Sequence, residues 1–212
     1  MSRKKAIHAH YEPRISPGRA HHDVLDWADA GGQQARFEVL VRHVDLAGRK
    51  LLDVGCGLGD LWAFLRERRI TADYTGVDIV RKMVLAARRK HPTGRFEHAD
   101  VFAENPFGAS SFDVVFCSGT FNLRLGNNLQ FLAEALKRLF EIARETVVFN
   151  LLHRRAARRY AHCFYYDPAE VRELIRPFPC ACTIYDDYLP NDFTVICRKR
   201  PVAKQGRGLQ TR

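Results

Sequence analysis

Three acidic residues lie at or beside the ends of three successive expected strands. Asp53 lies in the stretch 50–54, Asp78 ends the stretch 74–78, and Asp100 comes just after 95–98. Ligands of open parallel sheets bind at the carboxyl ends of the strands, so we expect these carboxylates to share one site. Carboxylates placed there accept hydrogen bonds from a ribose diol or an adenine amino group and attract a cationic ligand.

A glycine-rich turn follows the first of these strands. Gly55, Gly57 and Gly59 alternate with other residues directly before a helical pattern. Glycine permits a tight turn and close approach of a ligand to the backbone, and the free N–H groups of the helix's first turn lie beside it. The dinucleotide pattern Gly-x-Gly-x-x-Gly places its third glycine one position later, and here Asp60 follows. The glycine spacing therefore disfavours a nicotinamide dehydrogenase. An acid at the turn repels a pyrophosphate and favours a ligand that carries an ammonium or sulfonium.

The stretch Asp53-Val54-Gly55-Cys56-Gly57-Leu58-Gly59 resembles motif I, D/E-x-G-x-G-x-G, of the class I S-adenosylmethionine-dependent methyltransferases. The resemblance implies that Asp53 orients the turn and the methionine ammonium region. It also implies that Asp78 holds the ribose, that an apolar neighbour packs on the adenine, and that Asp100 binds the adenine edge. The co-substrate-binding residues implied by the resemblance and by the strand ends are Asp53, Gly55, Cys56, Gly57, Asp78, Ile79, Asp100, Val101 and Ser118.

Strand and helix patterns alternate along the chain, which predicts an α/β fold. The fold class is a doubly wound, mostly parallel sheet with helices on both faces and a C-terminal antiparallel hairpin; the resemblance implies seven strands, one reversed. We expect an N-terminal arm or lid at 1–32, a methyltransferase domain at 33–200 and a disordered basic tail at 201–212. The expected strands are 50–54, 74–78, 95–98, 112–117, 146–151, 181–188 and 193–199, and the expected helices are 33–44, 59–69, 80–90, 127–143 and 167–175.

Composition restricts the class of protein. The chain has 212 residues with a formal net charge of +10, and its six cysteines form no C-x-x-C pair. We expect one domain, reduced thiols, no membrane segment, no secretion signal and a cytoplasmic location. The basic residues are spread along the chain, which is typical of solvated faces but leaves RNA as a possible partner.

The sequence says less about the methyl acceptor and the catalytic residue. The signature (N/D)-P-P-(F/Y/W) of amino-methyltransferases is replaced by Ser118-Gly119-Thr120-Phe121, which disfavours exocyclic amines as acceptors, and no cysteine pair suggests carbon-5 pyrimidine chemistry. The catalytic residue is unknown. Weak candidates are His153, Tyr165, Tyr166 and Tyr11, and Arg14 or Arg36 could meet a carboxylate, although surface arginine is the commoner case. We expect no metal site at His8, His10, His21 and His22.

The sequence thus predicts a methyltransferase that moves a methyl group from S-adenosylmethionine to an O, N or S atom of a small molecule. One alternative is an RNA methyltransferase that uses the basic connector 153–166 and the tail. A second is a non-catalytic protein that binds S-adenosylmethionine or a partner. The oligomeric state stays open.

Overall fold

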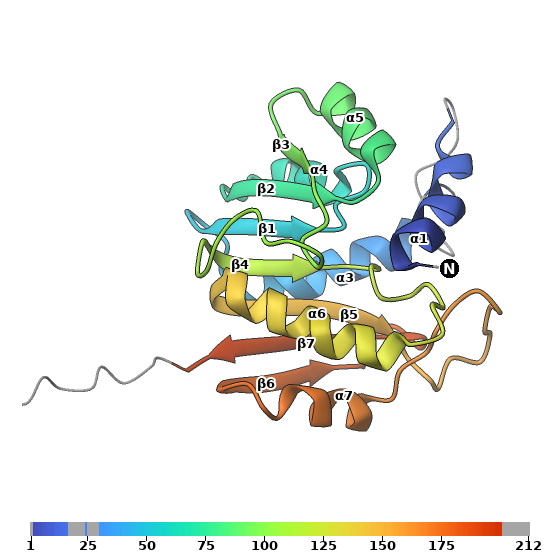
Figure 1. Ribbon diagram of the computed structural model, residues 1–212. Coiled ribbons are helices and arrows are strands. Elements are labelled where there is room, and N and C mark those ends of the chain that lie inside the picture. Colours follow the sequence, from blue (N-terminus) through green and yellow to red (C-terminus); the bar gives the residue numbers. More distant parts are fainter. Residues whose placement is uncertain (1, 17–23, 25–29, 201–212) are drawn as a thin grey trace, which may run out of the picture.

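A seven-stranded sheet forms the centre of the molecule, in the order β3-β2-β1-β4-β5-β7-β6 (Figure 1). The computed structural model describes residues 2–16, 24 and 30–200. The strands are β1 (Lys50–Val54), β2 (Asp73–Asp78), β3 (Arg95–His98), β4 (Phe112–Cys117), β5 (Ala143–Leu152), β6 (Cys180–Tyr185) and β7 (Asp192–Lys199). Strands β1 to β5 pair in parallel, whereas β7 is antiparallel to both β5 and β6. The predicted fold class is confirmed.

Helices cover both faces of the sheet, so the central strands β1 and β4 are buried along nearly their whole length. The helices are α1 (Arg3–Tyr11), the short 3-10 helix η1 (Glu12–Arg14), α3 (Ala30–His43), α4 (Asp60–Glu67), α5 (Arg81–Lys90), α6 (Asn128–Ile142) and α7 (Pro168–Ile175). One buried cluster joins the sheet to α3, α4 and α5, and a second joins it to α6 and α7. All six residues of β4 are buried between these layers.

The N-terminal segment, expected as an arm with weak periodicity, contains a regular helix instead. Ser2 caps α1 by accepting a hydrogen bond from the Lys5 N–H at 3.4 Å. Ile7 is the buried residue of α1 and packs with Val80 and Met83. A helix that buries so little has almost no hydrophobic period, so the sequence pattern could not reveal it. Figure 1 shows α1 beyond the tips of the parallel strands.

The remaining differences lie at element ends. Strand β6 ends at Tyr185 rather than at residue 188, and β5 begins at Ala143 rather than at residue 146. The expected helical turn near residues 24–27 lies mostly outside the described residues, as does the tail 201–212. Across the described residues, every helix is too short or too polar to cross a lipid bilayer.

Candidate functional site

The glycine turn after β1 is fixed to the neighbouring strand. The N–H groups of Gly55 and Cys56 donate to the Val77 carbonyl at 2.8 and 3.1 Å. Gly55 has a φ of +78°, a conformation that L side chains rarely adopt. A Cβ at Gly55 would also stand 2.2 Å from Thr120 Oγ1, so the turn passes directly against the loop after β4. Glycine is therefore required here by conformation and by space.

Asp78 connects this turn to the next strand. Its Oδ2 accepts a hydrogen bond from the Gly57 N–H at 3.0 Å, and its Oδ1 accepts one from the Val80 N–H at 2.7 Å. Burial raises the pKa of Asp78, although both backbone donors oppose the shift. The carboxylate thus sets the spacing between the glycine turn and the start of α5 while it borders the cavity described below.

Asp53 is buried beneath the same turn. Its Oδ2 accepts a hydrogen bond from the Tyr74 hydroxyl at 2.7 Å. Burial raises the pKa of Asp53 to about 7; the Tyr74 hydrogen bond opposes the shift, and the nearby carboxylates of Asp78 and Asp60 add to it. A carboxyl group with this pKa gains much from a cationic ligand, because a positive charge would favour its ionised form.

A cavity of about 230 Å³ opens at the carboxyl ends of β1, β2 and β4. Its lining combines the turn after β1, the end of β2, the loop after β4, helices α1 and α3, and the connector 153–166. Of the predicted co-substrate residues, the lining contains Asp53, Gly55, Cys56, Gly57, Asp78, Ile79 and Ser118. Seven of the nine predicted positions are thus brought together at one cavity.

Buried polar atoms without a partner gather at the end of β4. In the described part of the chain, Ser118 Oγ, Asn122 Oδ1 and Asn150 Nδ2 are buried and have no hydrogen-bond partner. Ser118 and Asn122 line the cavity, and Asn150 Oδ1 accepts a hydrogen bond from the Gly119 N–H at 3.3 Å. Leaving such groups unsatisfied costs roughly 1–3 kcal/mol each. Their position therefore suits a polar ligand at this end of the cavity.

The third predicted acid is engaged elsewhere. The Asp100 carboxylate forms an ion pair with Arg3 of α1 and accepts a hydrogen bond from the Phe102 N–H at 3.2 Å. Neither Asp100 nor Val101 lines the cavity. Their contact with an adenine stays a prediction, and it would require Arg3 to share or release Asp100.

The four weak catalytic candidates occupy different environments. Tyr11 and Tyr165 line the cavity, but the Tyr165 hydroxyl accepts a hydrogen bond from the Tyr160 N–H at 2.9 Å. Tyr166 is buried, lies outside the lining and donates to the Phe121 carbonyl at 2.9 Å. His153 also lies outside it, and its Nδ1 accepts from the Arg155 N–H at 3.0 Å. Tyr166 and His153 thus make these contacts outside the cavity lining, and a catalytic role for either stays a prediction.

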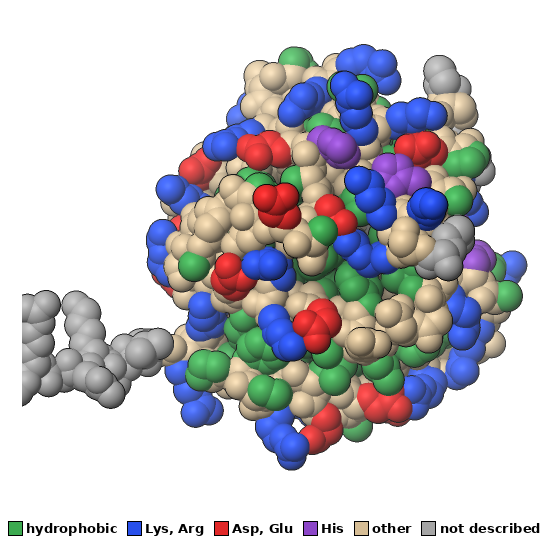
Figure 2. All heavy atoms as spheres, viewed as in Figure 1, with side chains coloured by type: hydrophobic (Ala, Val, Ile, Leu, Met, Phe, Trp, Pro, Cys, Tyr) green, Lys and Arg blue, Asp and Glu red, His purple; other side chains and the backbone are tan. Residues whose placement is uncertain are grey.

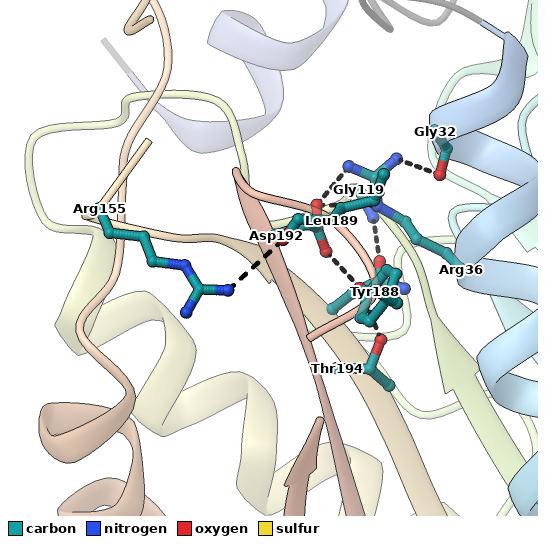
Figure 3. Close-up of polar contacts among 9 residues, drawn as sticks. Gly32, Arg36, Gly119, Arg155, Tyr188, Leu189, Asp192 and Thr194 are labelled. Atoms are coloured by element: carbon teal, nitrogen blue, oxygen red, sulfur yellow. Dashed lines mark hydrogen bonds and ion pairs between the residues drawn. The ribbon is translucent and has the colours of Figure 1, made fainter. Parts of the chain in front are cut away.

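Of the two positions weighed for Arg36, a carboxylate partner or the helix surface, the structure shows a carboxylate partner, which is Asp192 of the chain itself. Arg36 is 2% exposed and lines the cavity from α3. Its Nε donates to Asp192 Oδ2 at 2.9 Å, its Nη2 completes the ion pair, and its Nη1 donates to the Gly32 carbonyl at 3.2 Å. Figure 3 shows Arg36 and Tyr188 pointing toward Asp192, with Thr194 beyond Tyr188. The other weighed arginine, Arg14, donates to the His10 carbonyl at 2.6 Å.

Several lining residues were not singled out from the sequence. They come from α3, the loop after β4, the connector and the turn before β7, and include Gln33, Asn122, Leu123, Arg158, Tyr160, His162, Leu189 and Asn191. Of these residues, only Asn122 could have been found from the sequence, because it lies four residues after Ser118 in the loop after β4. Among the described residues no group of three or more His, Cys, Asp or Glu side chains is arranged to hold a metal, and His21 and His22 lie outside them.

Comparison with known proteins identifies methyltransferases among the proteins that this chain resembles in sequence. A family model described as a methyltransferase domain matches residues 51–141. A Mycobacterium tuberculosis protein described as a methyltransferase is 30% identical over 154 residues, which cover 69% of this chain and 91% of that protein. A phthiotriol/phenolphthiotriol dimycocerosates methyltransferase of Mycobacterium ulcerans is 38% identical over 74 residues, which cover 34% of this chain and only 27% of that protein.

Solved structures share the fold at low sequence identity. The magnesium protoporphyrin IX methyltransferase of Synechocystis PCC 6803, crystallised with SAH, has a TM-score of 0.67 and 15% identity, with 93% of this chain and 99% of that chain covered. A 4+2 cyclase, SpnF, has a TM-score of 0.61 and 16% identity, with 87% and 84% covered. The fold alone therefore does not fix the reaction. With the motif, the cavity and the relative that is covered over nearly its whole length, the chain belongs to the class I S-adenosylmethionine-dependent methyltransferase family.

Proposed function

We propose that this chain transfers the methyl group of S-adenosylmethionine to an O, N or S atom of a small-molecule acceptor. The observation that carries the proposal is the single cavity that joins Asp53, Asp78 and the glycine turn to the loop after β4. Asp53 and the glycine turn match motif I of the family, and Asp78 is the acid that the resemblance implies at the end of the next strand. The loop and the connector beyond it leave a polar wall for an acceptor.

The cavity is chemically suited to the co-substrate. The bare backbone at Gly55 allows close approach, Asp78 is positioned for a ribose, and Ile79 offers apolar surface to an adenine. When bound, S-adenosylmethionine supplies a methyl group already activated by its sulfonium. Asp53 and Asp78 favour that positive charge, while Ser118 and Asn122 orient polar acceptor atoms. Helix α1 closes one side of the cavity and excludes water from the reacting groups.

A small acceptor is supported over RNA by the surface as well as by the cavity. On the face seen in Figure 2, Lys and Arg side chains are interspersed with Asp and Glu and form no continuous basic surface. Nucleic-acid backbones are bound by clustered positive charge. Affinity for RNA that falls steeply with added salt would favour the RNA alternative.

The decisive experiment combines binding and turnover. Calorimetric titration with S-adenosylmethionine, S-adenosylhomocysteine and NAD should show micromolar binding of the two adenosyl compounds and none of NAD. Transfer of labelled methyl to a fractionated small-molecule pool should then follow. Binding without transfer to any pool would support the non-catalytic alternative, and failure of both adenosyl compounds to bind would overturn the proposal.

Removal of the Asp78 carboxylate should weaken co-substrate binding. We expect Asp78→Ala to cost about 1–3 kcal/mol of binding free energy, because two backbone donors and the ribose lose their acceptor. Asp78→Asn keeps one acceptor oxygen and should lose less. The measurement is the calorimetric Kd for S-adenosylhomocysteine, with thermal unfolding to check that both variants fold; unchanged affinity in folded Asp78→Ala would show that the ribose lies elsewhere.

Affinity for S-adenosylmethionine should depend on pH through Asp53. The pKa of Asp53 is about 7 in the free protein, and a cationic ligand binds the ionised carboxylate better. Protons must therefore be released on binding below pH 7, so affinity should rise about tenfold between pH 6 and pH 8 and then level off. Asp53→Asn should flatten this profile. A flat profile in the wild-type protein would contradict the prediction, and an unchanged profile in Asp53→Asn would assign the titration to another group.

A further inference from the structure

We propose that the acceptor carries an oxyanion group, a carboxylate or a phosphate ester, which binds to Arg124 and Arg159 in a second pocket beside the candidate site. The inference rests on the proposed function and specifies its substrate class. The second pocket is lined by Arg124, Arg154, Arg159, Tyr160, Ala161, Phe164 and Tyr165. Tyr160 and Tyr165 also line the main cavity, so the two spaces share one wall.

Two of the three arginines that line the second pocket, Arg124 and Arg159, have no carboxylate partner among the described residues. Within the part of the chain that the structure describes, no carboxylate lies in ion-pair distance of Arg124, Arg158 or Arg159. Arg124 donates to the carbonyls of Ala161 and Cys163 at 3.0 and 2.9 Å, which are neutral acceptors. Arg154 differs, because Asp167 and Glu170 pair with it. The pocket therefore presents two uncompensated guanidinium groups to a ligand.

Aromatic rings hold these guanidinium groups in place. Arg124 lies 5.8 Å from the centroid of the Phe164 ring, and Arg159 lies 5.6 Å from that of Tyr165. At the mouth of the main cavity, Arg158 lies 5.0 Å from the ring centroid of Tyr160. A guanidinium held on a ring face loses little freedom when it binds an oxyanion, and its fork of donors matches the oxygens of a carboxylate or phosphate.

Backbone pairing fixes the second pocket relative to the reacting end of the cavity. The Arg124 N–H donates to the His162 carbonyl at 2.7 Å, and the Phe164 N–H donates to the Asn122 carbonyl at 2.8 Å. Leu123 and Cys163 form a β-bridge between these bonds. Asn122, whose buried Oδ1 has no partner in the described chain, therefore lies on the segment that carries Arg124. The loop after β4 therefore carries Ser118 and Asn122 of the main cavity together with Arg124 of the second pocket.

The experiment measures binding of two probes, citrate and inorganic pyrophosphate, to the full chain saturated with S-adenosylhomocysteine. We expect calorimetric binding of at least one probe, weakened about tenfold or more in Arg124→Gln/Arg159→Gln, since charge-assisted hydrogen bonds are the strong ones. Arg124→Lys/Arg159→Lys keeps the positive charge but loses the forked donors of the guanidinium. Its affinity for the probe should therefore lie between those of the wild type and the double glutamine variant. The charge-matched control Arg89→Gln/Arg176→Gln changes two exposed arginines elsewhere and should bind as wild type does.

Each other outcome overturns the inference. It fails if neither probe binds, or if the control variant loses binding as much as the pocket variant does. It also fails if neither probe binds but a single-stranded RNA of about 20 nucleotides does, through Arg124 and Arg159 and with a steep salt dependence. Arg159→Gln alone keeps the result interpretable if loss of the Arg124 bonds unfolds the loop. Affinity of the wild-type protein for S-adenosylhomocysteine distinguishes failure of this inference from failure of the proposed function. If S-adenosylhomocysteine binds but neither probe does, only the oxyanion subsite is contradicted. If S-adenosylhomocysteine does not bind, the proposed function is contradicted as well.

Discussion

Gly55→Ala should nearly abolish co-substrate binding and lower the free energy of unfolding by about 2–5 kcal/mol. Two costs add. The φ of +78° is unfavourable for an alanine by about 1–2 kcal/mol, and a Cβ placed 2.2 Å from Thr120 Oγ1 forces overpacking that costs about 1–3 kcal/mol. Because the turn lines the cavity, any shift that relieves the clash also displaces the backbone that a ligand would lie against. Chemical denaturation and the calorimetric Kd for S-adenosylhomocysteine measure the two effects.

Gly48→Ala is the matched control for this prediction. Gly48 has a similar φ of +68°, but nothing lies within 4 Å of its added Cβ, and it does not line the cavity. It should therefore show the conformational cost alone and keep full affinity. Thr120→Ala combined with Gly55→Ala removes the clashing oxygen and should recover part of the lost stability. Equal losses in Gly48→Ala and Gly55→Ala would show that the contact with Thr120 does not matter.

Asp192→Ala should destabilise the protein by about 3–5 kcal/mol, the usual cost of leaving one charge of a buried pair without its partner. Arg36 and Asp192 are both buried, and two nitrogens of Arg36 bind the same carboxylate oxygen. Burial raises the pKa of Asp192, and the Arg36 guanidinium is the largest opposing influence. The Tyr188 hydroxyl donates to the other oxygen at 2.7 Å and would also lose its acceptor. Urea denaturation at neutral pH measures the change.

Replacing both partners tests whether the stranded charge is the cause. Arg36→Met/Asp192→Leu removes both charges and keeps apolar volume, so it should be considerably more stable than Asp192→Ala. A control of similar chemistry is Glu145→Ala, which breaks the exposed pair with Arg49 and should change stability by less than about 1 kcal/mol. If the double variant were as unstable as Asp192→Ala, packing rather than the unpaired charge would explain the loss.

The sequence by itself determined the sheet and the co-substrate side of the cavity. Strands 50–54 and 112–117 were predicted with the bounds that the structure shows, because largely apolar runs bounded by turn residues are a local property. Strand 95–98 was also predicted with its observed bounds, because the turn residues Pro92 and Gly94 precede it. Asp53 and Asp78 were placed at one site for a similar reason: parallel neighbours bring the residues at their carboxyl ends together.

Only the tertiary structure decided the acceptor side. Arg36 meets Asp192 across 156 positions of the chain, and no local pattern specifies such a partner. Tyr160 and Arg158 reach the cavity because backbone bonds tie their irregular connector to the loop after β4. Asp100, to which the resemblance assigns the adenine edge, forms an ion pair with Arg3 of a helix that the sequence did not predict. Strands follow from short-range periodicity, whereas these contacts depend on where distant segments pack once the sheet has formed.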